Sequence, residues 1–126
     1  MESCNIILVR LLMQSAIRVA QDFAQRVADA DYAAAHNFLT KTAKQTYSPE
    51  GFQRSFERMT AYEPGPIRKV DIDPEFTLED WPAKQPDDVA FVYVGLFGDD
   101  YVEAVSLTVS REDGELRIRE VEWGRP

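Results

Sequence analysis

The side chains that could carry acid–base chemistry are few, and His36 is the only histidine in the 126 residues. An imidazole titrates near neutral pH, so it can act as a general acid or base where it faces a pocket. Tyr32 lies four residues earlier, which on a helix places both side chains on one surface patch. Tyr32 and His36 are therefore the candidate catalytic residues. The alternative, and the commoner case, is a partly exposed helix histidine with no chemical role.

Metal and cofactor sites lack their usual ligands in this sequence. Cys4 is the only cysteine, and with one histidine and scattered carboxylates it does not make a convincing metal-ligand set. Asp71 and Asp73 fall on one face of a predicted strand and could hold a divalent cation, although such a face is more often solvated. No phosphate-binding glycine loop, dinucleotide fingerprint or Gly-x-Ser-x-Gly elbow is present. We therefore predict no metal and no cofactor.

Aromatic residues are the better indication of a binding surface, and the candidates are Tyr32, Trp81, Tyr93 and Trp123. Trp81 lies in a proline-flanked acidic loop, whereas Tyr93 and Trp123 lie on predicted strands. Where such side chains face solvent they can anchor a small apolar molecule or a protein partner. The alternative is that Tyr93 and Trp123 fill the core and that Trp81 holds its own loop in place.

The charge of the chain is −8 and is unevenly distributed. Residues 1–62 carry seven basic and six acidic side chains, a net +1, whereas residues 63–126 carry seven and sixteen, a net −9. A nucleic-acid binder needs clustered positive charge, and an anionic membrane surface attracts the same, so we expect neither partner. The acidic balance permits a basic protein partner.

An apolar stretch over residues 6–13 is interrupted by Arg10 and follows Glu2, so it does not have the form of a secretory signal. It is also too short to span a bilayer as a helix. Three interpretations are open: an extension of the first helix through residues 1–13, a partner-facing arm, or a natural start at Met13. We favour the extension. Since one cysteine cannot form an intrachain disulfide, we expect a reducing, cytoplasmic location.

The first half of the chain has helical periodicity. Apolar residues recur at three- and four-residue steps over residues 14–30 and predict an amphipathic helix. Asp31 is a good N-cap for a short second helix over residues 32–39. Residues 40–47 are either a loop or a further helical turn. Ser48, followed by a proline at the first helical position, predicts the start of another helix.

The second half has the period of two that is typical of strands, over residues 68–73, 89–97, 101–110 and 115–123. In the last of these, Leu116 and Ile118 share one parity, and Val121 and Trp123 share the other. One extra residue near positions 119–120 would bring all four to one face, so we predict a β-bulge that bends this strand.

Turn signals separate these strands. Residues 79–88 hold two prolines and several charges and predict a loop that ends in Asp87 and Asp88, in the ordinary place of such residues. Glu112-Asp113-Gly114 predicts a hairpin turn. Phe76 and Leu78 predict a short extra piece of strand before the loop. The strand over 89–97 is apolar on both faces, which is typical of a central strand covered on both sides.

This element order, with the local patterns of residues 29–40 and 48–52, resembles the nuclear transport factor 2-like superfamily, also called cystatin-like or ketosteroid isomerase-like. The resemblance spans about residues 14–123 and implies one α+β domain, in which N-terminal helices pack on a curved antiparallel sheet as a cone. It also implies a pocket between the helices and the concave face of the sheet. Together with the two-sided apolar strand over 89–97, it further implies a homodimer through the outer face of the sheet.

The superfamily includes isomerases, dehydratases and hydrolases, but also ligand binders, protein-interaction modules and immunity proteins, so the fold alone does not assign a function. The Tyr-plus-Asp site of the ketosteroid isomerases does not transfer, because the predicted helix over residues 14–30 carries no tyrosine. We therefore expect a non-enzymatic ligand- or protein-binding module. The alternatives are a cofactor-independent acid–base enzyme and an immunity-type protein that antagonises a basic toxin.

Overall fold

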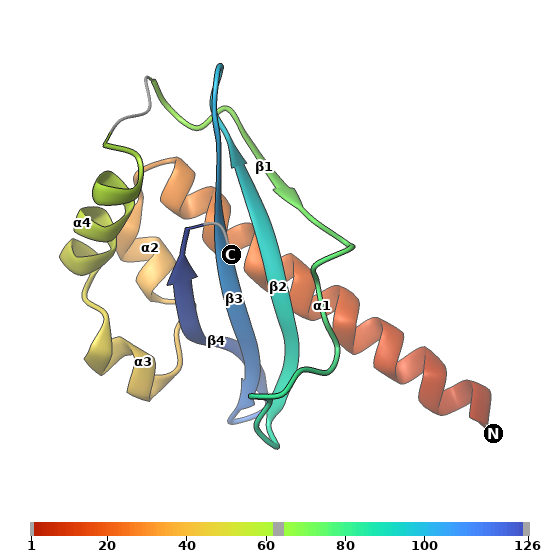
Figure 1. Cartoon of the computed structure of the whole chain (residues 1–126). Helices are drawn as coiled ribbons and strands as arrows, with labels where there is room; N and C mark the ends of the chain where they lie inside the picture. Colours follow the sequence, from red (N-terminus) through yellow and green to blue (C-terminus); the bar gives the residue numbers. More distant parts are fainter. Residues whose placement is uncertain (1, 62–64, 125–126) are drawn as a thin grey trace.

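The computed structural model describes the backbone of residues 2–61 and 65–124 and the side chains from Ile7 onward. Helices come first in these ranges and strands follow, as Figure 1 shows. The helices are α1 (Glu2–Ala28), α2 (Tyr32–His36), α3 (Lys41–Thr46) and α4 (Pro49–Met59). The strands are β1 (Lys69–Ile72), β2 (Asp88–Phe97), β3 (Val102–Glu112) and β4 (Glu115–Trp123), in one antiparallel sheet of order β1-β2-β3-β4. This confirms the predicted α+β class and the order of helices before sheet.

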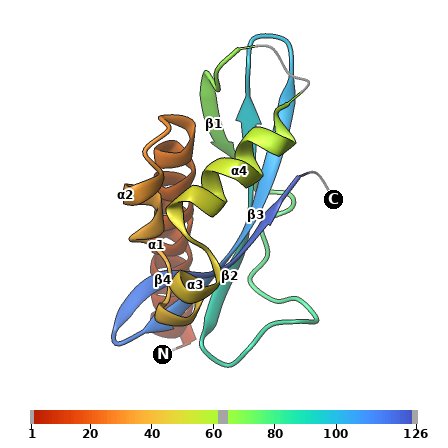
Figure 2. The same ribbon diagram turned by 90° about the vertical axis from the view of Figure 1, so that its left-hand side faces the viewer.

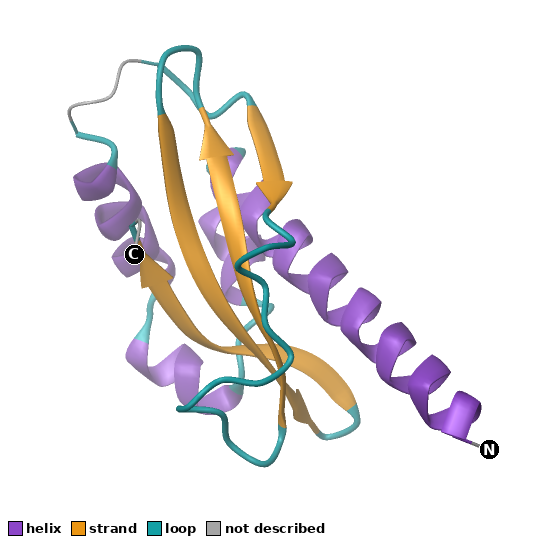
Figure 3. Ribbon diagram, turned by 45° about the vertical axis from the view of Figure 1, so that its right-hand side comes forward, coloured by secondary structure: helices purple, strands orange, loops and turns teal. Residues whose placement is uncertain are grey.

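Helix α1 is the long element that covers one face of the sheet. Its C-terminal half buries a stripe that includes Ala20, Phe23 and Val27, at the three- and four-residue steps of the sequence pattern. Its N-terminal half continues as helix past the sheet (Figures 1 and 3), and Leu8 is 62% exposed there. The preferred interpretation of the N-terminal stretch, a helical extension, is confirmed. No helix in the described ranges combines the length and the apolarity that crossing a bilayer requires.

The predicted helix caps are present. The Asp31 side chain accepts from the N–H of Ala34 at 3.2 Å, and the Ser48 hydroxyl accepts from the N–H of Gly51 at 2.9 Å. Helix α2, however, ends at His36, so the prediction of a helix to residue 39 is wrong.

The helix stops early because the chain pairs with β4 instead. The N–H of Ile118 donates to the carbonyl of Phe38 at 2.8 Å, and the N–H of Thr40 donates back to Ile118 at 2.9 Å. This parallel bridge covers part of the edge of β4. Thr40 then caps α3, which settles the open choice for residues 40–47 in favour of a helical turn.

The helices cover a single face of the sheet, as Figure 2 shows. The side chains directed at them are apolar and buried and alternate along each strand; they include Val70, Val92, Val94, Leu96, Val105, Leu107, Val109, Ile118 and Val121. We call the opposite side the open face. In Figure 3 the segment that follows β1 runs in front of the strands on this side. Its predicted strand piece is reduced to one bridge between Leu78 and Phe91.

Two irregularities interrupt the pairing of the strands. Between β3 and β4 the register passes from Thr108–Glu120 to Val109–Ile118, so Arg119 is the extra residue. This confirms the predicted bulge, and Ile118 and Val121 are consequently both buried. A second shift lies between β2 and β3, next to Asp88. Bulges bend and twist a sheet, and Figure 3 shows the curvature of β4.

The turn between β3 and β4 is the predicted hairpin. Asp113 and Gly114 have φ angles of 52° and 79°, the positive values that both central residues of a type I′ turn require.

Candidate functional site

Tyr32 and His36 lie on the helix-covered side, in a cluster of aromatic rings around Phe52. The His36 ring centroid is 6.3 Å from that of Phe52, and the Tyr32 centroid is 6.4 Å from that of Phe56. His36 Nε2 is 3.4 Å from the carbonyl oxygen of Lys44, which ties α2 to α3. The two candidate catalytic residues thus contact neighbouring rings and backbone.

The same cluster joins rings from α1, α4 and β4. The rings of Phe23 and Tyr47 each lie 5.6 Å from Phe52, and Trp123 lies 6.1 Å from it. Trp123 also contacts Phe56 of α4. This agrees with the alternative interpretation in which Trp123 fills the core. Burial, followed by the charge of Glu57, raises the pKa of the Tyr32 phenol, so this hydroxyl stays protonated at neutral pH.

The other two candidates, Trp81 and Tyr93, lie on the open face. The Trp81 ring is 5.8 Å from Phe91, and the ammonium of Lys84 lies 5.7 Å above it, so Trp81 holds the loop after β1 against β2. Tyr93 packs against Phe76 at 5.5 Å.

A hollow of about 470 Å³ opens beside Tyr93 on this face. The hollow forms where Gly95 and Ala104, which pair across β2 and β3, have almost no side chain to fill it. A Cβ at Gly95 would come within 2.7 Å of the Phe97 ring, so that ring lies over the glycine. The lining consists of Asp71, Ile72, Asp73, Pro74, Glu75, Phe76, Tyr93, Gly95, Phe97, Val102, Glu103 and Ala104. We call this hollow, with its aromatic walls and acidic rim, the open-face site.

The rim of the open-face site is shaped by a turn at Asp73. Its Oδ1 accepts from the N–H of Glu75 at 2.9 Å and from that of Phe76 at 3.4 Å, and Thr77 donates to the Asp73 carbonyl at 2.7 Å. This turn directs Phe76 toward Tyr93. Asp71 pairs instead with Lys69, at 3.7 Å. The two aspartates considered for a cation therefore have separate partners, and the described part of the chain holds no metal-ligand group of three or more.

A buried ion pair at the two bulges was missed by the sequence reasoning. Arg119 donates through Nε and Nη2 to the two carboxylate oxygens of Asp88, at 2.9 and 2.7 Å, and the Ser110 hydroxyl also donates to that carboxylate. The Asp88 side chain is fully buried and belongs to β2, so its prediction as an ordinary loop residue is wrong. The two partners lie 31 positions apart, and no local pattern connects them.

The charges within this pair support one another. Burial alone would raise the pKa of the Asp88 carboxyl, but hydrogen bonds from Arg119, Ser110 and the N–H of Gln85 outweigh it and hold that pKa below its usual value. The pKa of Arg119 is raised in turn by its hydrogen bonds to Asp88. The arrangement is a satisfied structural pair that fixes both bulges.

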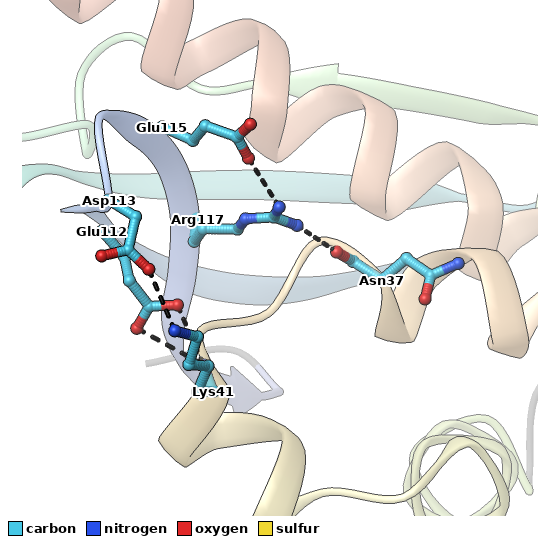
Figure 4. A network of polar contacts seen from close by, with 6 residues as sticks. All are labelled: Asn37, Lys41, Glu112, Asp113, Glu115 and Arg117. Atoms are coloured by element: carbon cyan, nitrogen blue, oxygen red, sulfur yellow. Dashed lines mark hydrogen bonds and ion pairs between the residues drawn. The ribbon is translucent and has the colours of Figure 1, made fainter.

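Further ionic contacts join the helices to the β3–β4 hairpin at the surface (Figure 4). Lys41 donates from its backbone N–H to Glu112 at 3.1 Å and from Nζ to Asp113 at 3.0 Å, and the contact with Asp113 raises the Lys41 pKa. Arg117 donates to the carbonyl of Asn37 and to Glu115, each at 2.6 Å. Exposed pairs of this kind orient elements and add little stability.

Comparison of the chain with models of known protein families, with curated proteins and with solved structures finds no match in any of the three. The resemblance to the nuclear transport factor 2-like superfamily therefore stays a prediction.

Proposed function

We propose that this domain is a non-enzymatic binding module whose ligand occupies the open-face site. The observation that carries the proposal is apolar and aromatic surface left uncovered on one side of the sheet. Phe76 and Val102 in the lining of the site are 51% and 42% exposed, and Leu78, which lies outside that lining, is 40% exposed. Apolar side chains gathered around a hollow typically mark a place where a ligand or partner binds, and about 470 Å³ falls within the usual size of such pockets.

Binding is favoured over catalysis by where the acid–base groups lie. Tyr32 and His36 pack on the helix side, so the sheet separates them from the open-face site. The titratable side chains in that site are carboxylates and Tyr93, and an acid–base enzyme would need one of them to work without the histidine. The rings around Phe52 pack against one another between the helices and β4, and this supports a site on the other face of the sheet.

The predicted homodimer would use the same open face. Two copies joined there would cover both open-face sites, so dimerisation and ligand binding would compete. Sedimentation with and without an apolar ligand tests whether the two compete. A ligand that binds at the dimer interface should convert a dimer into monomers, whereas a ligand that binds elsewhere should leave the dimer intact.

The test uses a neutral apolar fluorophore, N-phenyl-1-naphthylamine, whose emission rises when it leaves water. We expect the intact chain to bind it and Phe76→Ser to weaken binding several-fold, since this change removes one wall of the hollow. Leu8→Ser is the matched control, because it removes a similarly exposed apolar side chain from α1, outside the site. If Phe76→Ser and Leu8→Ser bind the fluorophore equally well, or if the intact chain does not bind it, the proposal is wrong.

A further inference from the structure

We propose that the ligand of the open-face site is an organic cation, a primary ammonium or guanidinium group on an apolar stem. The inference rests on the proposed function and adds the chemical class of the ligand. The charge of the lining is its first support. Asp71 and Glu75 are exposed and Asp73 is half-buried on the rim, and none of the described lining residues is a lysine, arginine or histidine. An anionic ligand would be repelled, and a cation attracted.

The walls supply the second part of the recognition. Phe76, Tyr93 and Phe97 present aromatic rings, and the faces of such rings attract cations through their quadrupole. Between them, Ala104 and the Phe97 ring that lies over Gly95 form an apolar floor against which an alkyl or aryl stem can pack. A compact inorganic cation would make no use of these walls, whereas an amine on an apolar body would contact both the rings and the rim.

The chain's own Lys69 shows this chemistry at the edge of the site. Its ammonium nitrogen is 5.7 Å from the centroid of the Phe97 ring and 3.7 Å from Oδ2 of Asp71. A primary ammonium is therefore already accommodated between an aromatic wall and a rim carboxylate. The Lys69 side chain is 67% exposed, so an incoming ammonium can displace it at small cost. Lys69 thus acts as a weak internal competitor for the ligand.

The experiment compares three ligands that share one apolar body: 4-phenylbutylammonium, 4-phenylbutanol and 5-phenylpentanoate. Calorimetric titration of the full chain should give an affinity for the ammonium about tenfold above that for the alcohol, and weakest binding for the carboxylate. Raising the salt concentration should reduce the preference for the ammonium, because the rim is exposed. Equal affinities for the ammonium and the alcohol would overturn the ligand class and leave the proposed function standing. Absence of binding by all three would overturn both.

Two kinds of variant locate the cation. Lys69→Met removes the internal competitor and should tighten ammonium binding by about two- to fivefold. Lys84→Met is its matched control, since it removes the same charge from above the ring of Trp81, which does not line the site. Asp71→Asn should weaken ammonium binding several-fold and leave alcohol binding unchanged. All three positions are exposed, so the unfolding midpoints should stay equal. Tightening by Lys84→Met alone, or by neither lysine variant, would overturn the placement.

The cationic group can belong to a free amine or to a basic side chain of a protein, and a peptide distinguishes these sources. A lysine-containing peptide that binds more tightly than phenylbutylammonium, and that loses binding when its lysine is acetylated, would identify a protein partner. A small amine that binds while the peptide does not would identify a free amine. Failure of both cations to bind would overturn the proposal.

Discussion

Replacing Arg119 with alanine should destabilise the domain far more than the loss of an exposed charge would. The change leaves the Asp88 carboxylate, whose side chain is 0% exposed, with only Ser110 and the N–H of Gln85 as partners. Removing one partner of a buried ion pair costs about 3–5 kcal/mol. Because the Arg119 side chain is 25% exposed, water can enter its place, and we expect about 3 kcal/mol in the free energy of unfolding.

A double-mutant cycle measured by urea unfolding isolates the pair. Asp88→Ala leaves a partly exposed guanidinium 3.6 Å from Glu120 and should cost about 2 kcal/mol, within the range for hydrogen bonds to charged groups. The double variant should cost less than Arg119→Ala alone, because it also removes the buried carboxylate that Arg119→Ala leaves without its partner. Arg68→Ala removes a pair with both side chains about 60% exposed and should change stability by less than about 1 kcal/mol.

The pH dependence follows from the lowered pKa of Asp88. A carboxyl whose folded pKa lies below its unfolded value stabilises the fold above the unfolded value, near 3.9, and this contribution is lost as the pH falls through the folded pKa. Without Arg119, burial raises the Asp88 pKa, so the variant gains stability on acidification from neutral pH. The difference between the two proteins should therefore shrink from pH 7 toward pH 4. A constant difference, or additive single and double variants, would refute this account of the pair.

Three further predictions concern the fold. Phe52→Ala should cost about 3–5 kcal/mol in urea unfolding, since its fully buried ring is the centre of the aromatic cluster, and a loss below about 1 kcal/mol would contradict that role. Ser48→Ala should cost about 1 kcal/mol by removing the cap of α4, whereas Ser48→Asp should retain the helix signal in circular dichroism; equal losses would rule the cap out. Gly114→Ala should cost about 1–2 kcal/mol in thermal unfolding because of its positive φ, and an unchanged midpoint would argue against the type I′ turn.

Elements with local signals were predictable from the sequence, and contacts between distant segments were not. The parity change between Ile118 and Val121 lies within one strand and correctly located the bulge. The end of α2 was misplaced because it depends on pairing with Ile118, about 80 positions away. The helix over residues 6–13 was one of three open interpretations, and the structure confirms it as part of α1.

The open-face site was not predictable for a similar reason. Strand β2 is apolar on both sides, so its sequence does not say which side the helices cover. Tyr93 and Trp81 were predicted as binding candidates from their residue type, but their location opposite His36 follows only from the packing of α1. In the sequence, Asp71 and Asp73 have the pattern of an ordinary solvated strand face. Their place in the lining of the hollow depends on the fold.

The extra residue at Arg119 also constrains how this sequence can change by insertion and deletion. Deleting Arg119 would join Ile118 to Glu120 and restore strict alternation along β4, and Val121 and Trp123 would keep their β3 partners and stay on the helix-covered face. The loss of this one codon would then remove the bulge and the ionic partner of Asp88 without exchanging the core and solvent faces of the strand. Distant relatives should therefore either keep the insertion, with a partner for its side chain, or carry apolar residues of a single parity throughout. In an alignment, a relative without the bulge should show a one-residue gap at position 119, with the apolar positions on both sides still matched.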